Sequence, residues 1–158
     1  MNFCASLSAT CIVAIAVMLP SPTLAQTNLR IGTWKLNLPQ SSFSPGPAFR
    51  DESQIAEMIG DAVKVTVEIT DATARKLVQG YTAKYDGKSY PFPGSPWETI
   101  ALTLLDAYTS KAVFHRGGKA VQTTILTVSP DGKQLTIMAT GTTPDGQPLN
   151  NREVFDRQ

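Results

Sequence analysis

Aromatic side chains form the group in this sequence that is best suited to bind a small molecule. Tyr81 and Tyr85 share one face of an expected strand, and a stretch that interleaves aromatic residues with proline and glycine follows it. Phenol groups can make hydrogen bonds inside a mostly apolar cavity, so these rings could line the mouth of a ligand-binding cavity. They could equally fold over the end of the molecule as a plug. The candidate ligand-binding residues are Tyr81, Tyr85, Tyr90, Phe92 and Trp97.

The other side chains with reactive groups do not form a catalytic pattern. His115 is the single histidine, two residues before the Gly117-Gly118 turn, and we expect it to be exposed. No second histidine or neighbouring cysteine completes a metal site or a nucleophile pair. Six aspartates occupy expected turns, where the carboxylate bonds to its own backbone; they are Asp61, Asp71, Asp86, Asp106, Asp131 and Asp145. We therefore expect no enzymatic activity, no metal and no cofactor.

The charge balance limits the classes of partner. The chain of 158 residues carries 14 basic and 13 acidic side chains, and they are scattered without runs. Recognition of nucleic acid or of an acidic membrane surface requires a basic excess on one face. We therefore expect neither partner; the partner that we expect is a small apolar molecule.

The first 25 residues resemble a secretory signal peptide. An unbroken apolar run from Cys11 to Leu19 is followed by Pro20 and Pro22, with small residues before a cleavage site ahead of Gln26. Nine apolar residues are too few to span a bilayer, which takes about 20. The sequence thus predicts a signal peptide over 1–25, a secreted or periplasmic protein without stable membrane insertion after cleavage, and one domain over 26–158. Both cysteines would leave with the signal.

Turn dipeptides recur at nearly even spacing through the mature chain, and they separate stretches rich in β-branched and aromatic residues. Asp-Gly and Gly-Gly pairs supply the positive φ angles of tight hairpin turns. Nine strands are expected, at about 29–38, 51–59, 63–69, 76–85, 98–105, 111–116, 119–129, 133–141 and 149–157. The prediction is an all-β fold, an antiparallel up-and-down meander of about eight to ten strands closed into a barrel, with a β-sandwich as the alternative.

Alternation is clearest from Val63 to Ile69, where four apolar residues share one face and polar residues occupy the other. Two proline-containing segments interrupt the strands, and prolines cannot donate to a central ladder. We therefore expect loops at Ser41 to Ala48 and at Ser89 to Trp97.

The first expected strand carries Gly32-Thr33-Trp34-Lys35-Leu36, which resembles the Gly-x-Trp signature of the calycin group, the lipocalins and fatty-acid-binding proteins. The resemblance implies an up-and-down barrel in which the tryptophan plugs the closed end and a basic residue of the last strand lies against it. Arg152 or Arg157 could take that part, and we assign the structural signature to Gly32, Trp34 and Arg152. The chain also resembles uncharacterised secreted bacterial proteins that have a Tyr-Asp-Gly-Lys hairpin, here at Tyr85 to Lys88.

Two functions are compatible with these expectations. One is a lipocalin-like carrier that binds a small apolar or amphiphilic ligand in the barrel. The other is a non-enzymatic protein-interaction or inhibitor module of the cell envelope, whose barrel is filled by its own side chains. An eight-stranded barrel is close to the size at which side chains just fill the interior. The inward-facing residues therefore decide between the two functions.

Overall fold

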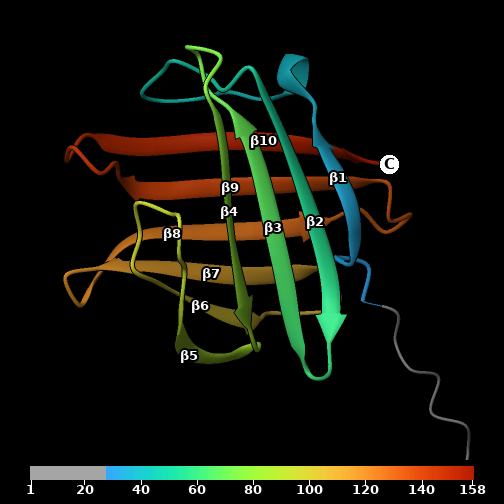
Figure 1. Ribbon diagram of the computed structural model, residues 1–158. Helices are drawn as coiled ribbons and strands as arrows, with labels where there is room; N and C mark the ends of the chain where they lie inside the picture. The colour runs from blue at the N-terminus through green and yellow to red at the C-terminus, as the bar shows by residue number, and fades with distance from the viewer. Residues whose placement is uncertain (1–27) are drawn as a thin grey trace, which may run out of the picture.

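A computed structural model describes residues 28–158, and the expected signal peptide lies outside this range. The described chain forms ten antiparallel strands and one short 3-10 helix (Figure 1). The elements are β1 (Gly32–Leu36), η1 (Leu38–Gln40), β2 (Asp51–Ile59), β3 (Ala62–Thr70), β4 (Lys76–Ala83), β5 (Asp86–Pro91), β6 (Thr99–Leu104), β7 (Thr109–Arg116), β8 (Lys119–Val128), β9 (Gln134–Thr142) and β10 (Pro148–Arg157).

All ten strands belong to one sheet in the order β4-β3-β2-β1-β10-β9-β8-β7-β6-β5. Strands adjacent in the chain are also neighbours in the sheet, except that β1 pairs with β10 and that β4 and β5 form the two edges. The sheet bends so that β1 to β4 cross in front of β6 to β10 (Figure 1). This arrangement confirms the all-β antiparallel meander, folded into a nearly closed barrel.

The strand β5 corrects the expectation of a loop from Ser89 to Trp97. Tyr90 pairs with Ile100 of β6, so the first part of that segment belongs to the sheet, and only the part after Pro91 is a loop. Proline is tolerated because β5 is an edge strand. The expected hairpin at Tyr85 to Lys88 is also wrong, because β4 and β5 are not paired with each other.

Alternation along β3 produces the predicted inward face. The four apolar residues at 63, 65, 67 and 69 are buried, whereas Lys64 and Glu68 are exposed. Buried apolar residues form two clusters, one around Trp34 and Phe155 and the other between β3 and the strands β6 and β7. The barrel thus has two differently packed regions, and the candidate site lies in only one of them.

Candidate functional site

Trp34 marks the end of the barrel that is closed by side chains. Its side chain is 1% exposed, and the indole Nε1 donates a hydrogen bond of 3.0 Å to the carbonyl oxygen of Arg30. The Arg157 guanidinium lies over the indole ring, 4.2 Å from its centroid. We call this region, with its turns at 29–31, 105–109 and 129–133, the closed end.

The arginine against Trp34 is Arg157, and the assignment to Arg152 is wrong. Trp34 of β1 is the register partner of Arg157 on β10, which places the guanidinium beside the indole. Arg152 is exposed and instead donates a hydrogen bond to the carbonyl of Gln40. Gly32 fits its role in the signature, because a Cβ at this position would lie 2.3 Å from Nη1 of Arg157 and its φ is +138°.

Both arginines of the closed end donate to acceptors supplied by surrounding turns. The Arg157 guanidinium donates to the carbonyl oxygens of Leu29, Ile31 and Gly132. Arg30 is 7% exposed, and its guanidinium donates to Ser110 Oγ and to the carbonyl of Asp106. These bonds satisfy the buried donors and join the N-terminal turn to the far side of the barrel. The closed end is therefore structural.

A cavity of about 430 Å³ lies at the other end of the barrel. Its rim comes from the segment at 43–49, the loop at 92–97 and the turn at 143–149. We call this region the open end. Apolar side chains of β3, β8 and β9 form one part of the cavity wall; they include Val65, Val67, Ile69, Leu126 and Ile137.

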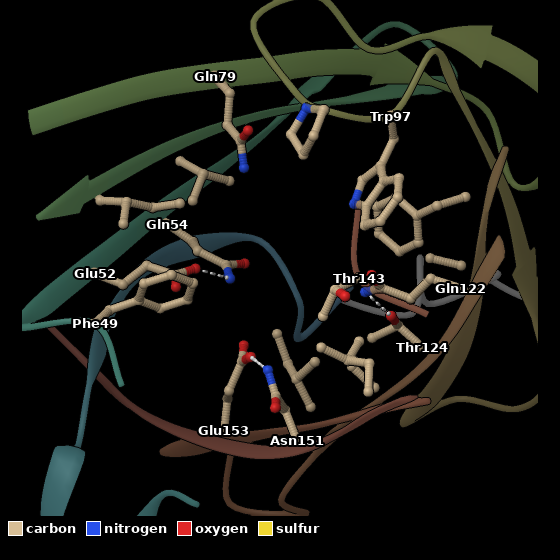
Figure 2. A pocket seen from close by; sticks show the side chains of 18 of the residues that line it. Phe49, Glu52, Gln54, Gln79, Trp97, Gln122, Thr124, Thr143, Asn151 and Glu153 are labelled. Carbon is tan, nitrogen blue, oxygen red and sulfur yellow. Dashed lines mark hydrogen bonds between the residues drawn. The ribbon is translucent and has the colours of Figure 1, made fainter. Parts of the chain in front are cut away.

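Three of the five aromatic candidates lie on the cavity wall. Tyr81 and Phe92 meet edge to face with ring centroids 5.1 Å apart, and the ring centroids of Trp97 and Phe114 are 6.4 Å apart. Phe92 is only 4% exposed and belongs to the core, so it closes the wall as a plug would. Trp97 is half-buried at the rim (Figure 2).

The remaining two candidates are not on the wall. Tyr85 lies toward the closed end, where the charge of Arg30 acts on its hydroxyl group. Tyr90 lies on the edge strand β5, and its hydroxyl donates a hydrogen bond of 3.0 Å to Asp86. The structure therefore brings together Tyr81, Phe92 and Trp97, and places the other two elsewhere.

Arg116, at the end of β7, joins two parts of the rim. Its guanidinium lies 5.7 Å from the centroid of the Trp97 ring and donates a hydrogen bond of 2.8 Å to the carbonyl of Pro144. The loop at 92–97 and the turn at 143–149 are thereby connected beside the opening. Arg116 does not line the cavity wall.

A band of polar side chains inside the cavity is the feature that the sequence reasoning missed (Figure 2). Gln54 donates to Glu52 across 2.9 Å, and Asn151 donates to Glu153 across 3.2 Å. The interior is thus neither filled nor uniformly apolar, and two strands on either side of β1 supply its acids. The polar residues on the wall are Glu52, Gln54, Gln79, Gln122, Thr124, Thr143, Asn151 and Glu153.

The two glutamates are strongly perturbed by their surroundings. Burial raises the pKa of Glu52 to about 8, and the charge of Glu153 adds to this, against a lowering by the hydrogen bond from Gln54. Burial likewise raises the pKa of Glu153 to about 7, and the hydrogen bond from Asn151 opposes it. The side chains are 4% and 9% exposed. The negative charge of this pair is therefore poorly compensated by the protein.

A signal for these acids exists in the pattern of β2. In this strand Glu52, Gln54 and Ala56 face inward, whereas Ile55 is 37% exposed. This inverts the usual alternation, in which apolar residues face the interior. A polar inward face on a strand of a small barrel indicates a polar cavity.

The other reactive residues have structural positions. Five of the six aspartates bond to backbone or side chains of their own turns, as expected; for example, Asp71 accepts from the Thr73 amide at 2.9 Å. Asp61 instead forms an ion pair with Lys84. His115 is half-buried, not exposed, and its Nδ1 has no hydrogen-bond partner among residues 28–158.

Within 28–158, no group of three or more His, Cys, Asp or Glu side chains is placed to hold a metal ion. No helix in the same range is long and apolar enough to cross a membrane.

Comparison with known proteins gave matches among solved structures alone. No family model matches the chain, and no curated protein matches it. The chain is structurally similar to zebrafish ileal bile acid-binding protein complexed with cholic acid, at 11% identity and a TM-score of 0.49, over 82% of this chain and 99% of that one. It is also similar to the siderocalin Ex-FABP, described as having dual ligand specificities, at 13% identity and a TM-score of 0.39, over 82% and 74% of the two chains.

Proposed function

We propose that this protein is a noncatalytic carrier that binds one small amphiphilic molecule inside the barrel. The observation that carries the proposal is the cavity of about 430 Å³ at the open end. Small-molecule sites are typically concave, about 300–1,000 Å³, mostly apolar and equipped with a few convergent polar groups. The apolar walls and the polar band of this cavity match that description.

The cavity also bears on the alternative of a filled interaction module. A filled barrel needs large apolar side chains at the inward positions, whereas here glutamate, glutamine and asparagine occupy several of them. Burying such groups without a polar ligand or water is costly. The carrier is therefore favoured over the filled module.

Uptake of a neutral fluorescent probe, N-phenylnaphthylamine, tests the carrier function. Ala139 lies on the wall and is 3% exposed, so Ala139→Phe fills part of the cavity. Met138→Phe is the matched control, because Met138 is the neighbour on the same strand and is 40% exposed. We expect strong uptake by the unmodified protein and the control, and weak uptake by Ala139→Phe at unchanged secondary structure. Absent uptake by the unmodified protein, or equal uptake by all three, contradicts the proposal.

We further propose that the carrier is exported to the periplasm or beyond. The support is the apolar run from Cys11 to Leu19 and the small residues before Gln26. Expression in a bacterial host followed by cell fractionation and N-terminal sequencing tests it. We expect an exported protein that begins at or near Gln26. A cytoplasmic protein that begins at Met1 contradicts it.

A further inference from the structure

The charges on the cavity wall are all of one sign. Among residues 28–158, Glu52 and Glu153 are the wall residues with acidic side chains, and no lysine, arginine or histidine lines the cavity. Arg116 at the rim is engaged by Trp97 and Pro144, and Lys35 is bound to Asp51. An anionic ligand would therefore meet two acidic groups and no counter-ion inside the cavity.

Each acid also has unused hydrogen-bonding capacity. Glu52 accepts one hydrogen bond from Gln54 and Glu153 accepts one from Asn151, in each case at Oε1. No described residue donates to the second oxygen of either carboxylate, although both side chains are more than nine-tenths buried. A buried carboxylate normally accepts several hydrogen bonds, and the lack of donors costs stability. Water or a ligand in the cavity has to supply the remaining donors.

The location of the acids suits the head of an amphiphile. Both carboxylates project into the same cavity, Glu52 from β2 and Glu153 from β10 (Figure 2). Val65, Val67 and Ile69 on β3 provide an apolar wall in that cavity. A molecule with an alkyl or aromatic body could therefore bury the body against β3 while its head contacts both acids.

We propose that the natural ligand is an amphiphile with a cationic amine headgroup, and that Glu52 and Glu153 bind its ammonium group. This inference rests on the proposed carrier function and specifies its ligand class. An ammonium group has three N–H donors and no acceptor, so it can donate to both free oxygens, and its single positive charge balances one carboxylate while the other acid keeps its proton. The raised pKa values of the two acids fit the same assignment, because the protein itself does not compensate the charge.

Three amphiphiles with a common alkyl chain separate the contribution of the headgroup to affinity from that of the apolar body. Dodecylamine, dodecanol and dodecanoate compete for N-phenylnaphthylamine bound to the protein, below their aggregation concentrations and at neutral pH. The ammonium group is a charged hydrogen-bond donor in the buried site, whereas the hydroxyl group of dodecanol is an uncharged one. We therefore expect dodecylamine to bind roughly tenfold to a hundredfold more tightly than dodecanol. Dodecanoate should bind most weakly.

Substitutions assign the preference to the two acids. In the double variant Glu52→Gln with Glu153→Gln, we expect the preference for dodecylamine over dodecanol to fall to about twofold or less, with dodecanol affinity retained. Glu57→Gln is the matched control, because Glu57 is on the same strand as Glu52 and is exposed. It should keep the full preference. Thermal melting of each variant verifies that it is folded.

The outcomes separate this inference from the carrier proposal. Equal binding of the amine and the alcohol, tightest binding of dodecanoate, or a preference that survives in the double variant overturns the amine assignment and leaves the carrier intact. If neither the probe nor any of the three amphiphiles binds, the carrier proposal fails and the ligand class fails with it.

Discussion

The two ends of this barrel bury charge in opposite ways. At the closed end, three backbone carbonyls accept hydrogen bonds from the guanidinium of Arg157, which also lies over Trp34. At the open end, Glu52 and Glu153 each receive one hydrogen bond and face a cavity. The fold tolerates a charge whose hydrogen-bond partners are in place, whereas a buried charge left without partners lowers stability unless something binds. The difference separates the structural end from the binding end.

The two ends also differ in what their turns and loops supply to the interior. The turns of the closed end point carbonyl oxygens inward at the arginines. The segments of the open end carry prolines and aromatic rings, which form a rim and supply few donors to the interior. Substitutions at the closed end should therefore change the free energy of unfolding, whereas those at the open end should mainly change binding and its pH dependence.

The largest effect of a single substitution is expected for Trp34→Ala. The ring is 1% exposed and packs with Phe155 and Leu36, so its removal leaves a large cavity at the closed end. The free energy of unfolding should fall by roughly 3 to 5 kcal/mol, measured by urea denaturation. Trp97→Ala at the rim is the control, because Trp97 is only half-buried. Equal losses in the two variants would show that the closed end is not the more tightly packed region.

The second prediction concerns pH and the open end. Because burial raises the pKa of Glu52 to about 8 and that of Glu153 to about 7, from an ordinary 4.5, the folded protein binds protons more tightly than the unfolded chain. Their stabilising contribution is complete below about pH 4.5 and is lost as the pH rises toward about 8. The free energy of unfolding should fall by up to roughly 1.4 kcal/mol per pH unit for each proton that the folded protein retains and the unfolded chain has lost.

Urea denaturation between about pH 5 and pH 8, without ligand, measures this slope. The double variant Glu52→Gln with Glu153→Gln lacks both ionisable groups, so its stability should decline less over the same interval. The aspartates with lowered pKa act in the opposite direction and at lower pH, and they are the same in both proteins. Parallel slopes for the two proteins would contradict the assignment of the raised pKa values.

The fold was largely predictable because its strands follow simple alternation and its turns have characteristic residues. The strand from Val63 to Ile69 shows this best, since its apolar face is buried and its lysine and glutamate are exposed. The strand β5 could not be predicted in the same way, because Pro91 argues against a ladder position. Only the sheet order shows that β5 is an edge, where proline costs no ladder hydrogen bond.

The candidate site was less predictable, for two physical reasons. Sequence alternation predicts apolar residues inside, so the inverted strand β2 hid Glu52 among residues expected to face water. The choice between Arg152 and Arg157 depended on register across strands far apart in the chain, and local pattern does not determine it. Local pattern also could not separate the aromatic candidates. Tyr81 lies on the cavity wall, whereas Tyr85, on the same expected strand, lies toward the closed end.

The third prediction sharpens the assignment of the closed-end arginine. Arg157→Ala removes the cation over Trp34 and leaves three carbonyls without donors, so stability should fall by about 2 kcal/mol. Arg152→Ala is the matched control on the same strand, because that side chain is exposed and donates to one carbonyl. It should change stability by about 0.5 kcal/mol or less. A larger loss for Arg152→Ala than for Arg157→Ala would reverse the assignment.

A small effect on stability, below about 1 kcal/mol, is expected for Arg116→Ala at the rim. Its guanidinium joins Trp97 to the carbonyl of Pro144, and the surface position makes both contacts weak. The same change should release the loop at 92–97 from the turn at 143–149, so probe association and dissociation should both become faster while the equilibrium affinity changes little.

Stopped-flow fluorescence with N-phenylnaphthylamine measures these two rates directly. Lys119→Ala is the control, because Lys119 is exposed at the start of β8, in the same hairpin as Arg116, and does not line the cavity. Faster exchange in Arg116→Ala alone would assign the rim contact a role in ligand entry. If both rates are unchanged in Arg116→Ala, the ligand does not pass between the loop at 92–97 and the turn at 143–149, and entry between the unpaired edge strands β4 and β5 becomes the better explanation.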